Sequence, residues 1–395
     1  MTKHDPIVIA GAARTPIGNF LGAFNGVKAT ELGARSIEAA LERGGVAKND
    51  VDEVLMGCVL PAGLGQAPAR QSALGAGLPQ DTACTTVNKM CGSGMKTVMM
   101  AHDAILAGTG EVIVAGGMES MTNAPHLLPS GRGGIKYGQG VVYDHMAIDG
   151  LEDAYEPGRA MGVFAEKCAR EWQFSREDQD EYSMRSVTRA QTAIDDGSFK
   201  NEIVPVEVKT RKGAVTIDND EKPGLVDANK IPKLRAAFEK DGTVTAGNAS
   251  AISDGAAALV LMRQSTADAK GAKPVARILA HSTHAQAPEW FTTAPVASIA
   301  TVLEKAGWSA DEVDLYEINE AFSVVPLAAM REHKLPADKV NIHGGAIALG
   351  HPIGASGARI LCTLISALQK TGRKKGVASL CIGGGEATSV ALELI

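Results

Sequence analysis

Short apolar runs and segments with helical periodicity alternate along the start of the chain. Residues 6–11 and 51–59 are apolar runs of strand length, and the first run ends at a glycine. Between them, residues 30–42 repeat apolar side chains at helical spacing, with Thr30 as the expected N-cap. This alternation of strand and helix predicts an α/β sheet.

The same order of elements occurs twice. In residues 91–117 a Ser-Gly pair opens an apolar helical segment, a strand follows at 111–115, and two glycines end it. In residues 355–385 a second Ser-Gly pair opens a helical segment, a strand follows at 377–382, and three glycines end it. We interpret the two stretches as an internal duplication of one α/β half. The alternative is a chance match, since many α/β units share this order.

Residues 121–250 have a different composition, with polar loops, prolines and charged helical segments. Ser175 and Asp178 form the signature of a capping box at the start of one of these helices. We expect an inserted, loop-rich subdomain, because long insertions beside a sheet commonly carry binding functions. The predicted division has two α/β halves and one insertion: residues 1–121 with 251–273, residues 122–250, and residues 274–395.

Composition and charge narrow the class of protein. A chain of 395 residues suits two or three domains, and 44 glycines with only 4% aromatics favour small-residue packing over a β-sandwich. The formal net charge of −6 is spread along the chain, which argues against nucleic-acid binding. No apolar run reaches the roughly 18 residues of a membrane span. The polar start lacks a signal-peptide pattern and the end lacks an S-K-L-type signal, so we expect a soluble cytoplasmic protein.

Six cysteines are scattered along the chain without a C-x-x-C pair. This spacing argues against a zinc site, so no metal is expected. Without an export signal a disulfide framework is not expected either. Most of these thiols should be small buried apolar groups, and any chemical role has to come from the surrounding residues.

Cys91 stands in the segment 88–94 (NKMCGSG), immediately before a predicted helix. A thiol at a helix N-terminus lies at the positive end of the helix dipole, which is expected to lower its pKa. The adjoining glycines permit a sharp turn and close approach of a ligand to the backbone. Cys91 is therefore a candidate nucleophile; the alternative is a structural cysteine beside a tight turn.

His351 stands in the glycine-rich segment 344–359 (GGAIALGHPIGASGAR) and is followed by a proline. A histidine held in one orientation suits general-base catalysis. The alternatives are a phosphate-binding loop or a hydrogen-bonded structural histidine, although the spacing matches no P-loop or dinucleotide motif. His343 beside a strand end is interpreted as structural.

Two further segments add candidate groups. Asn319 follows an apolar run and could hold a water or an oxyanion, or simply cap a helix. Cys381 precedes Gly383 and two more glycines, so a second thiol and exposed N–H groups could serve proton transfer and oxyanion binding. The alternative for Cys381 is a buried strand cysteine. Together with Cys91 and His351, these residues describe a site for nucleophilic catalysis.

At this point the chain resembles the thiolase family over nearly its whole length, and its short-chain acetyl-CoA acetyltransferase branch most of all. The resemblance is carried by six segments in the family's order: residues 88–94, 111–121 (EVIVAGGMESM), 243–250 (TVTAGNAS), 319–322 (NEAF), 344–359 and 381–385 (CIGGG). It implies a five-layered α-β-α-β-α core of two similar halves, an inserted CoA-binding loop domain, and assembly as a homotetramer or dimer.

The resemblance also implies a role for each candidate. Cys91 is acylated while His351 takes its proton, and Cys381 removes the α-proton of the second acetyl-CoA. Asn319, through a water, and His351 hold one thioester oxygen, whereas the N–H groups of Cys91 and Gly383 hold the other. A thiolate is both a good nucleophile and a good thioester leaving group, so the acyl transfer can run in both directions.

The residues expected to contact the substrate match pocket and CoA-binding positions of the family: Ser250, Ala246, Met161, Ala321 and Phe322. The chain departs from the family at Arg159, where a histidine is common, at the shortened segment 220–224, and at His343, where an asparagine is common. These departures concern acyl-chain preference and CoA contacts.

The expected function is that of an acetyl-CoA C-acetyltransferase, which condenses two acetyl-CoA reversibly to acetoacetyl-CoA and CoA. The partners are these CoA thioesters, and no further cofactor is expected. The alternatives are a degradative thiolase for longer or branched 3-ketoacyl-CoA and an inactive CoA- or lipid-binding homologue. A related decarboxylating condensing enzyme lacks the 381–385 motif. With two thiols in one site, a regulatory Cys91–Cys381 disulfide is a further hypothesis.

Overall fold

One continuous mixed sheet runs through the computed structural model, which describes residues 5–395. The polar start at residues 1–4 lies outside the described residues. The strands of the first half are β1 (Ile7–Arg14), β2 (Gly18–Asn19), β3 (Glu53–Gly57), β4 (Ala83–Val87), β5 (Val112–Ser120) and β10 (Ser253–Arg263). Those of the second half are β11 (Ala276–Ala285), β12 (Leu315–Ile318), β13 (Lys375–Ile382) and β14 (Glu386–Leu394).

The two halves repeat the same sheet topology. The first has the order β4-β3-β5-β10-β1 and the second has the order β12-β13-β14-β11, with a parallel bridge from Tyr316 to Val340 in the position of β4. In both halves the outer pairs are parallel and the inner pairs antiparallel. The halves join where β1 and β11 pair antiparallel over two residues. The predicted internal duplication is confirmed.

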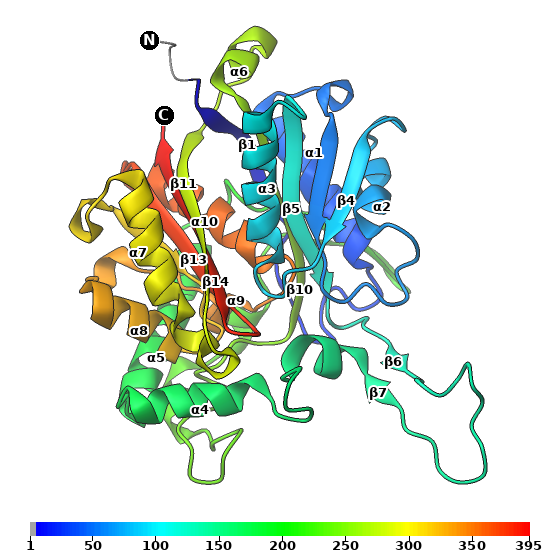
Figure 1. The fold of residues 1–395 in the computed structure, drawn as a ribbon, viewed down its shortest axis with the longest axis vertical. Helices are drawn as coiled ribbons and strands as arrows, with labels where there is room; N and C mark the ends of the chain where they lie inside the picture. Colours follow the sequence, from blue (N-terminus) through cyan, green and yellow to red (C-terminus); the bar gives the residue numbers. More distant parts are fainter. Residues whose placement is uncertain (1–4) are drawn as a thin grey trace.

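Helices cover both faces of each half, so the molecule has five layers (Figure 1). They are α1 (Ala29–Gly44), α2 (Pro68–Gly75), α3 (Ser93–Ala107), α6 (Gln264–Lys270), α7 (Ala294–Ala306), α8 (Val324–His333), α9 (Ala346–Leu349) and α10 (Ser356–Thr371). One apolar core joins α1 and α2 to the first half, and another joins α7 and α8 to the second. A third core packs α3 and α10 between the two halves. The predicted α-β-α-β-α architecture is confirmed.

Glycines let the N-termini of α3 and α10 lie against each other. A Cβ on Gly94 would lie 2.9 Å from the backbone nitrogen of Ala358, and one on Gly357 would lie 2.3 Å from that of Met95. Both distances are too short for any side chain. The two Ser-Gly pairs found in the sequence therefore mark the contact between the central helices.

Some expected element boundaries are wrong. The strand expected to end at Gly11 continues to Arg14, with a register shift between Ile9 and Gly11. The N-cap of α1 is Lys28, and Thr30 lies buried inside the first turn, because local sequence patterns locate helix ends only to within a residue or two. The strand expected at 111–115 continues through the glycine pair to Ser120. A Cβ on Gly117 would lie 2.0 Å from the carbonyl oxygen of Gly354. These glycines serve close backbone approach within a strand and do not end it.

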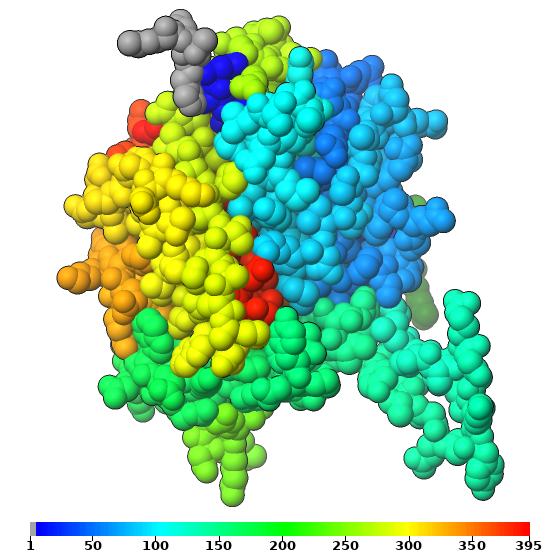
Figure 2. All heavy atoms as spheres, in the orientation of Figure 1, coloured from blue at the N-terminus to red at the C-terminus, as the bar shows by residue number. Residues whose placement is uncertain are grey.

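The segment between β5 and β10 carries the loops and helices that flank the site. Its elements are β6 (His126–Leu127), β7 (Tyr143–Asp144), α4 (Met161–Glu171), α5 (Arg176–Asp195), β8 (Val206–Thr210) and β9 (Gly213–Ile217). The capping box predicted at Ser175 and Asp178 is confirmed at the start of α5. Figure 2 shows the hairpin between β6 and β7 projecting away from the body of the molecule. Among residues 5–395, no helix combines the length and apolar character needed to cross a bilayer.

Candidate active site

Cys91 is held by a strained turn directly before α3. Met90, the preceding residue, has φ of +47°, a left-handed conformation that non-glycine residues seldom adopt. Its backbone is bound on both sides: its N–H donates to Oδ1 of Asn88 at 2.9 Å, and its carbonyl accepts from Oγ of Ser93 at 2.6 Å. The Ser93 hydroxyl oxygen also accepts from the N–H of Lys89 at 2.9 Å. The turn therefore fixes the backbone position of Cys91.

Burial dominates the acidity of the Cys91 thiol. It raises the pKa of Cys91 to about 11, although the N–H groups of Gly383 and of Cys91 itself point at the sulfur and act in the opposite direction. The expectation that the helix dipole lowers this pKa is therefore wrong, because loss of solvation outweighs it. In the free protein near neutral pH the thiol is protonated, so a base has to remove its proton when the nucleophile reacts.

The reactivity of Cys91 towards iodoacetamide should follow this raised pKa. Only the thiolate reacts, so we expect the alkylation rate to rise about tenfold per pH unit between about pH 7 and about pH 9, without a plateau. Mass spectrometry of the Cys91 peptide measures the rate, and the partly buried Cys84 in the same digest is the control for reagent stability. A rate that levels off below about pH 8 would show a low-pKa thiolate and contradict this reading.

His351 carries a neutral imidazole whose orientation is fixed by Ser356. Its Nδ1 lies 2.5 Å from Oγ of Ser356, whose own proton goes to the carbonyl of Pro352 at 3.0 Å. Because the hydroxyl is already a donor to Pro352, His351 donates through Nδ1–H, and Nε2 carries the lone pair. Burial lowers the pKa of His351 to about 3, so the ring is neutral at physiological pH. Gly350, at φ of +115°, supplies the backbone turn before it.

Replacing Ser356 with alanine should slow the acyl transfer that the sequence predicts, although the imidazole of His351 stays in the site. The loss of one hydrogen bond of about 1 to 1.5 kcal/mol predicts roughly tenfold lower kcat, with KM changed less, because the tautomer and the ring orientation are no longer fixed. Ser366→Ala on the same helix α10 is the matched control. Equal kcat for Ser356→Ala and the control would contradict the positioning role.

Three other predicted residues surround this pair. Asn319 follows β12 directly, its side chain is fully buried, and neither its amide oxygen nor its nitrogen has a hydrogen-bond partner among the described residues. It does not cap α8, which begins at Val324. Cys381 is buried at the end of β13, close enough to Cys91 that charge on that sulfur raises the pKa of Cys381 further. Gly383 begins the turn into β14.

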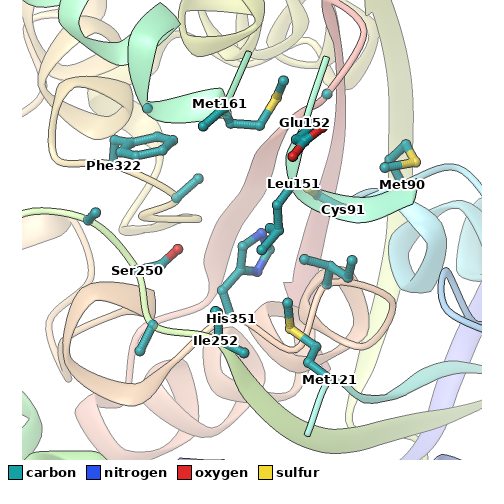
Figure 3. Close-up of a pocket in the computed structure, with 18 of the residues that line it drawn as sticks. Met90, Cys91, Met121, Leu151, Glu152, Met161, Ser250, Ile252, Phe322 and His351 are labelled. Atoms are coloured by element: carbon teal, nitrogen blue, oxygen red, sulfur yellow. The ribbon is translucent and has the colours of Figure 1, made fainter. Parts of the chain in front are cut away.

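A cavity of about 740 Å³ brings most of the predicted residues together. Its wall contains Cys91, His351, Gly383, Met161, Ser250, Ala246, Ala321 and Phe322. Figure 3 shows the His351 ring projecting into this space beside Leu151, with Ser250 and Phe322 on the same wall. Asn319 and Cys381 are not part of the wall, although Cys381 lies close to the wall residue Cys91. Polar atoms left without partners, such as Nε2 of His351, are unusual in a protein interior and indicate a site for a ligand.

Comparisons with known proteins agree with this geometry. The model of the thiolase N-terminal domain matches residues 7–265, and that of the thiolase C-terminal domain matches residues 272–394. The chain belongs to the thiolase family. Acetyl-CoA acetyltransferase 1 of Arabidopsis thaliana is 50% identical over 392 residues, which cover 98% of this chain and 94% of that protein. Acetyl-CoA acetyltransferase of Rhizobium meliloti (strain 1021) is 49% identical over 393 residues, covering 99% of each.

A solved thiolase structure is also similar throughout. The crystal structure of the Bacillus anthracis acetyl-CoA acetyltransferase superposes with a TM-score of 0.96 at 40% sequence identity, and the match covers 100% of both chains. The resemblance to the thiolase family is therefore confirmed for both the family and the fold.

The positions where this thiolase departs from the family pattern have clear structural roles. Arg159 donates to Glu156 at 2.6 Å and stacks over the ring of Phe164, outside the cavity wall. His343 packs edge-to-face on Phe199 and is buried away from the cavity, as the structural interpretation expects. Asp220 forms a buried ion pair with Arg14 at 2.7 Å. The segment 220–224 is thereby anchored to the first half.

Several site residues of the thiolase were not assigned a role from the sequence. Phe238 and Phe291 line the cavity and form an edge-to-face aromatic group with Phe322, with ring centroids 6.0 and 6.3 Å apart. Glu119 is fully buried and accepts backbone N–H groups from both the loop after β3 and Gly354. Burial raises the pKa of Glu119 to about 7. Glu119 belongs to segment 111–121, one of the six segments that carry the family resemblance. Nothing local in the sequence marks the two phenylalanines.

Proposed function

We propose that this thiolase is an acetyl-CoA C-acetyltransferase that condenses two acetyl-CoA molecules reversibly to acetoacetyl-CoA and CoA. The full-length acetyl-CoA acetyltransferase relatives support the reaction. The observation that carries the mechanism is the convergence of a protonated thiol, a neutral imidazole and backbone N–H groups on one cavity. The proposed intermediate is an acetyl thioester on Cys91.

In the first half-reaction the sulfur of Cys91 attacks the carbonyl carbon of acetyl-CoA while Nε2 of His351 takes the thiol proton. The negative charge on the carbonyl oxygen is stabilised by the N–H groups of Cys91 and Gly383, both of which face the Cys91 sulfur. The CoA sulfur then leaves and recovers the proton from His351. This step returns His351 to its neutral form and leaves acetyl-Cys91.

In the second half-reaction Cys381 removes a proton from the methyl carbon of a second acetyl-CoA. Its pKa is raised well above the ordinary value, so its thiolate is a strong base, as a weakly acidic thioester requires. Cys381 first loses its own thiol proton to solvent, and in acetyl-Cys91 the neighbouring sulfur is part of a thioester that cannot carry a charge opposing this ionisation. The enolate, held by His351 and, through a water, by Asn319, attacks acetyl-Cys91, and the bond from the acetyl carbon to the Cys91 sulfur breaks. The released sulfur takes up the proton from Cys381, which then recovers its own proton from solvent.

A short-chain preference is proposed because bulky side chains crowd the cavity. The three phenylalanines already described and Met161 lie along its wall. Each extra methylene that lacks space costs about 1–3 kcal/mol in specificity. We therefore expect kcat/KM for thiolysis of acetoacetyl-CoA to exceed that for a straight-chain substrate two methylenes longer by at least roughly tenfold.

Thiolysis by free CoA across a series of chain lengths tests this proposal. A higher kcat/KM for a long or branched 3-ketoacyl-CoA would assign the chain to the degradative alternative. Absence of activity on every substrate, with CoA still bound, would favour an inactive binding homologue.

We further propose that the protein works without a metal or redox cofactor in catalysis and forms a homotetramer in the cytoplasm. The projecting β6–β7 hairpin exposes apolar side chains that suit a subunit contact, namely Leu128, Ile135, Tyr137, Val141, Val142 and Tyr143. The strand β4 is at the end of the sheet order, so its outer edge is also available for pairing. All six cysteines are free, which fits a reducing compartment.

A further inference from the structure

Two histidines and one aspartate meet at the seam between the two halves, away from the cavity. His102 and Asp103 lie on α3, and His281 lies on β11. Oδ1 of Asp103 is 3.1 Å from Nδ1 of His102 and 2.8 Å from Nε2 of His281. The ligand-capable atoms of the three side chains all lie within 4.8 Å of one another. Figure 1 shows α3 running beside the strands of the second half at this seam.

The convergence does not follow from helix geometry alone. Consecutive residues on an α-helix point about 100° apart, so neighbours such as His102 and Asp103 do not ordinarily face each other. Here both turn towards His281, which is 178 positions away in sequence. The two imidazole rings pack edge-to-face with centroids 5.1 Å apart. A cluster of three possible ligands from two halves of the fold is therefore already assembled.

Two of the three ligand separations are close to what a tetrahedral divalent cation requires. Two ligand atoms bound to one Zn²⁺ at about 2.0 Å lie about 3.3 Å apart in tetrahedral geometry. The observed separations of 2.8 and 3.1 Å from the carboxylate oxygen to the two ring nitrogens are close to that value. The two ring nitrogens lie within 4.8 Å of each other and would close around the ion together with the carboxylate.

The surroundings allow an ion to enter. The side chains of His102 and His281 are 13% and 18% exposed, and that of Asp103 is 57% exposed, so the cluster is reachable from solvent yet supported by packing. The Lys305 ammonium is already engaged with the backbone here, because it donates to the carbonyl oxygen of His281 at 3.1 Å. Asp103 lies ten residues after the start of α3, about 15 Å along the helix at about 1.5 Å per residue. Binding here would act on stability and not on the chemistry.

We propose that His102, Asp103 and His281 bind one Zn²⁺ per subunit, with water completing the coordination. Two imidazoles and a carboxylate are ligands that zinc prefers, and three protein ligands leave one position for water. The ion joins α3 of the first half to β11 of the second and so fastens the two halves together. The expectation of no metal was drawn from the cysteine spacing. That spacing excludes only a cysteine type of zinc site and does not bear on a cluster of two histidines and an aspartate.

The test is a Zn²⁺ titration of the full-length, reduced protein in competition with a chromophoric chelator. Wild type should take up one more Zn²⁺ per subunit than His281→Gln or Asp103→Asn; because all variants keep the same six cysteines, binding by thiols cancels in the comparison. Each of these substitutions should weaken Zn²⁺ binding by at least roughly tenfold, since removal of an outer-shell partner alone causes a loss of that size. Zn²⁺ should also raise the thermal unfolding midpoint of wild type and leave that of His281→Gln unchanged.

His126→Gln, which removes an exposed histidine on the projecting hairpin, is the matched control and should bind like wild type. Equal Zn²⁺ uptake by wild type, His281→Gln and Asp103→Asn would overturn the proposal. An equal loss in His126→Gln would overturn it as well, since it would show unspecific binding by surface histidines. Asp103→Asn keeps the shape of an exposed side chain, so its result stands even if His281→Gln does not fold.

Discussion

Replacing Cys91 with alanine abolishes turnover in both directions, with a loss of roughly 10⁴-fold or more in kcat for the thiolysis of acetoacetyl-CoA by CoA. The reason is that no other group can carry the acetyl unit between the two half-reactions. Removing the nucleophile leaves substrate binding and the oxyanion contacts of Gly383 in place, and these accelerate the reaction only weakly by themselves. KM should therefore change far less than kcat.

Cys84→Ala is the control for the loss of a thiol as such. Cys84 lies partly buried on β4, outside the cavity wall, so its replacement should leave kcat near that of wild type. If the Cys91→Ala enzyme kept more than about a tenth of wild-type activity, the covalent mechanism would be contradicted. General-base catalysis and oxyanion stabilisation would then account for the rate without an acyl-enzyme.

Replacing Cys381 with alanine separates the two half-reactions. We expect acetoacetyl-CoA synthesis to fall roughly 10³-fold, within the range of general acid–base contributions, because nothing replaces the base that removes the α-proton. Acetylation of Cys91 by acetyl-CoA does not require Cys381 and should persist. The acetyl-enzyme should therefore accumulate, which intact-protein mass spectrometry measures directly.

Cys362→Ala is the matched control for Cys381→Ala. Cys362 is also fully buried but lies on α10 and does not interact with Cys91. It should form acetyl-enzyme and turn over as wild type does. If Cys381→Ala fails to become acetylated while remaining folded, Cys381 acts in the first half-reaction and the proposed division of roles is wrong.

Much of the fold follows from patterns that act within short stretches of chain. The repeated Ser-Gly, helix, strand and glycine order reports the duplication because both copies need glycine where the central helices touch. The capping box at Ser175 needs only residues three positions apart. The same holds for the motif around His351, where glycine and proline fix the backbone locally.

Other features depend on contacts between distant segments and leave little local signal. The pKa of Cys91 is set by burial between the two halves, which outweighs the helix position visible in the sequence. Phe238 meets Phe322 only because the insertion folds over the second half, and Phe291 meets Phe322 through the folding of the second half itself. The glycine pair at 116–117 resembles a strand end until the partner backbones that approach it are known.

The most direct test of the account is to incubate wild-type protein briefly with acetyl-CoA, quench it in acid and map the modified peptide by mass spectrometry. The account predicts one acetyl group per subunit, carried on Cys91, which is lost when free CoA is added before the quench. An acetyl group on another residue, or active enzyme with no covalent adduct under any quench, would contradict the acyl-Cys91 mechanism.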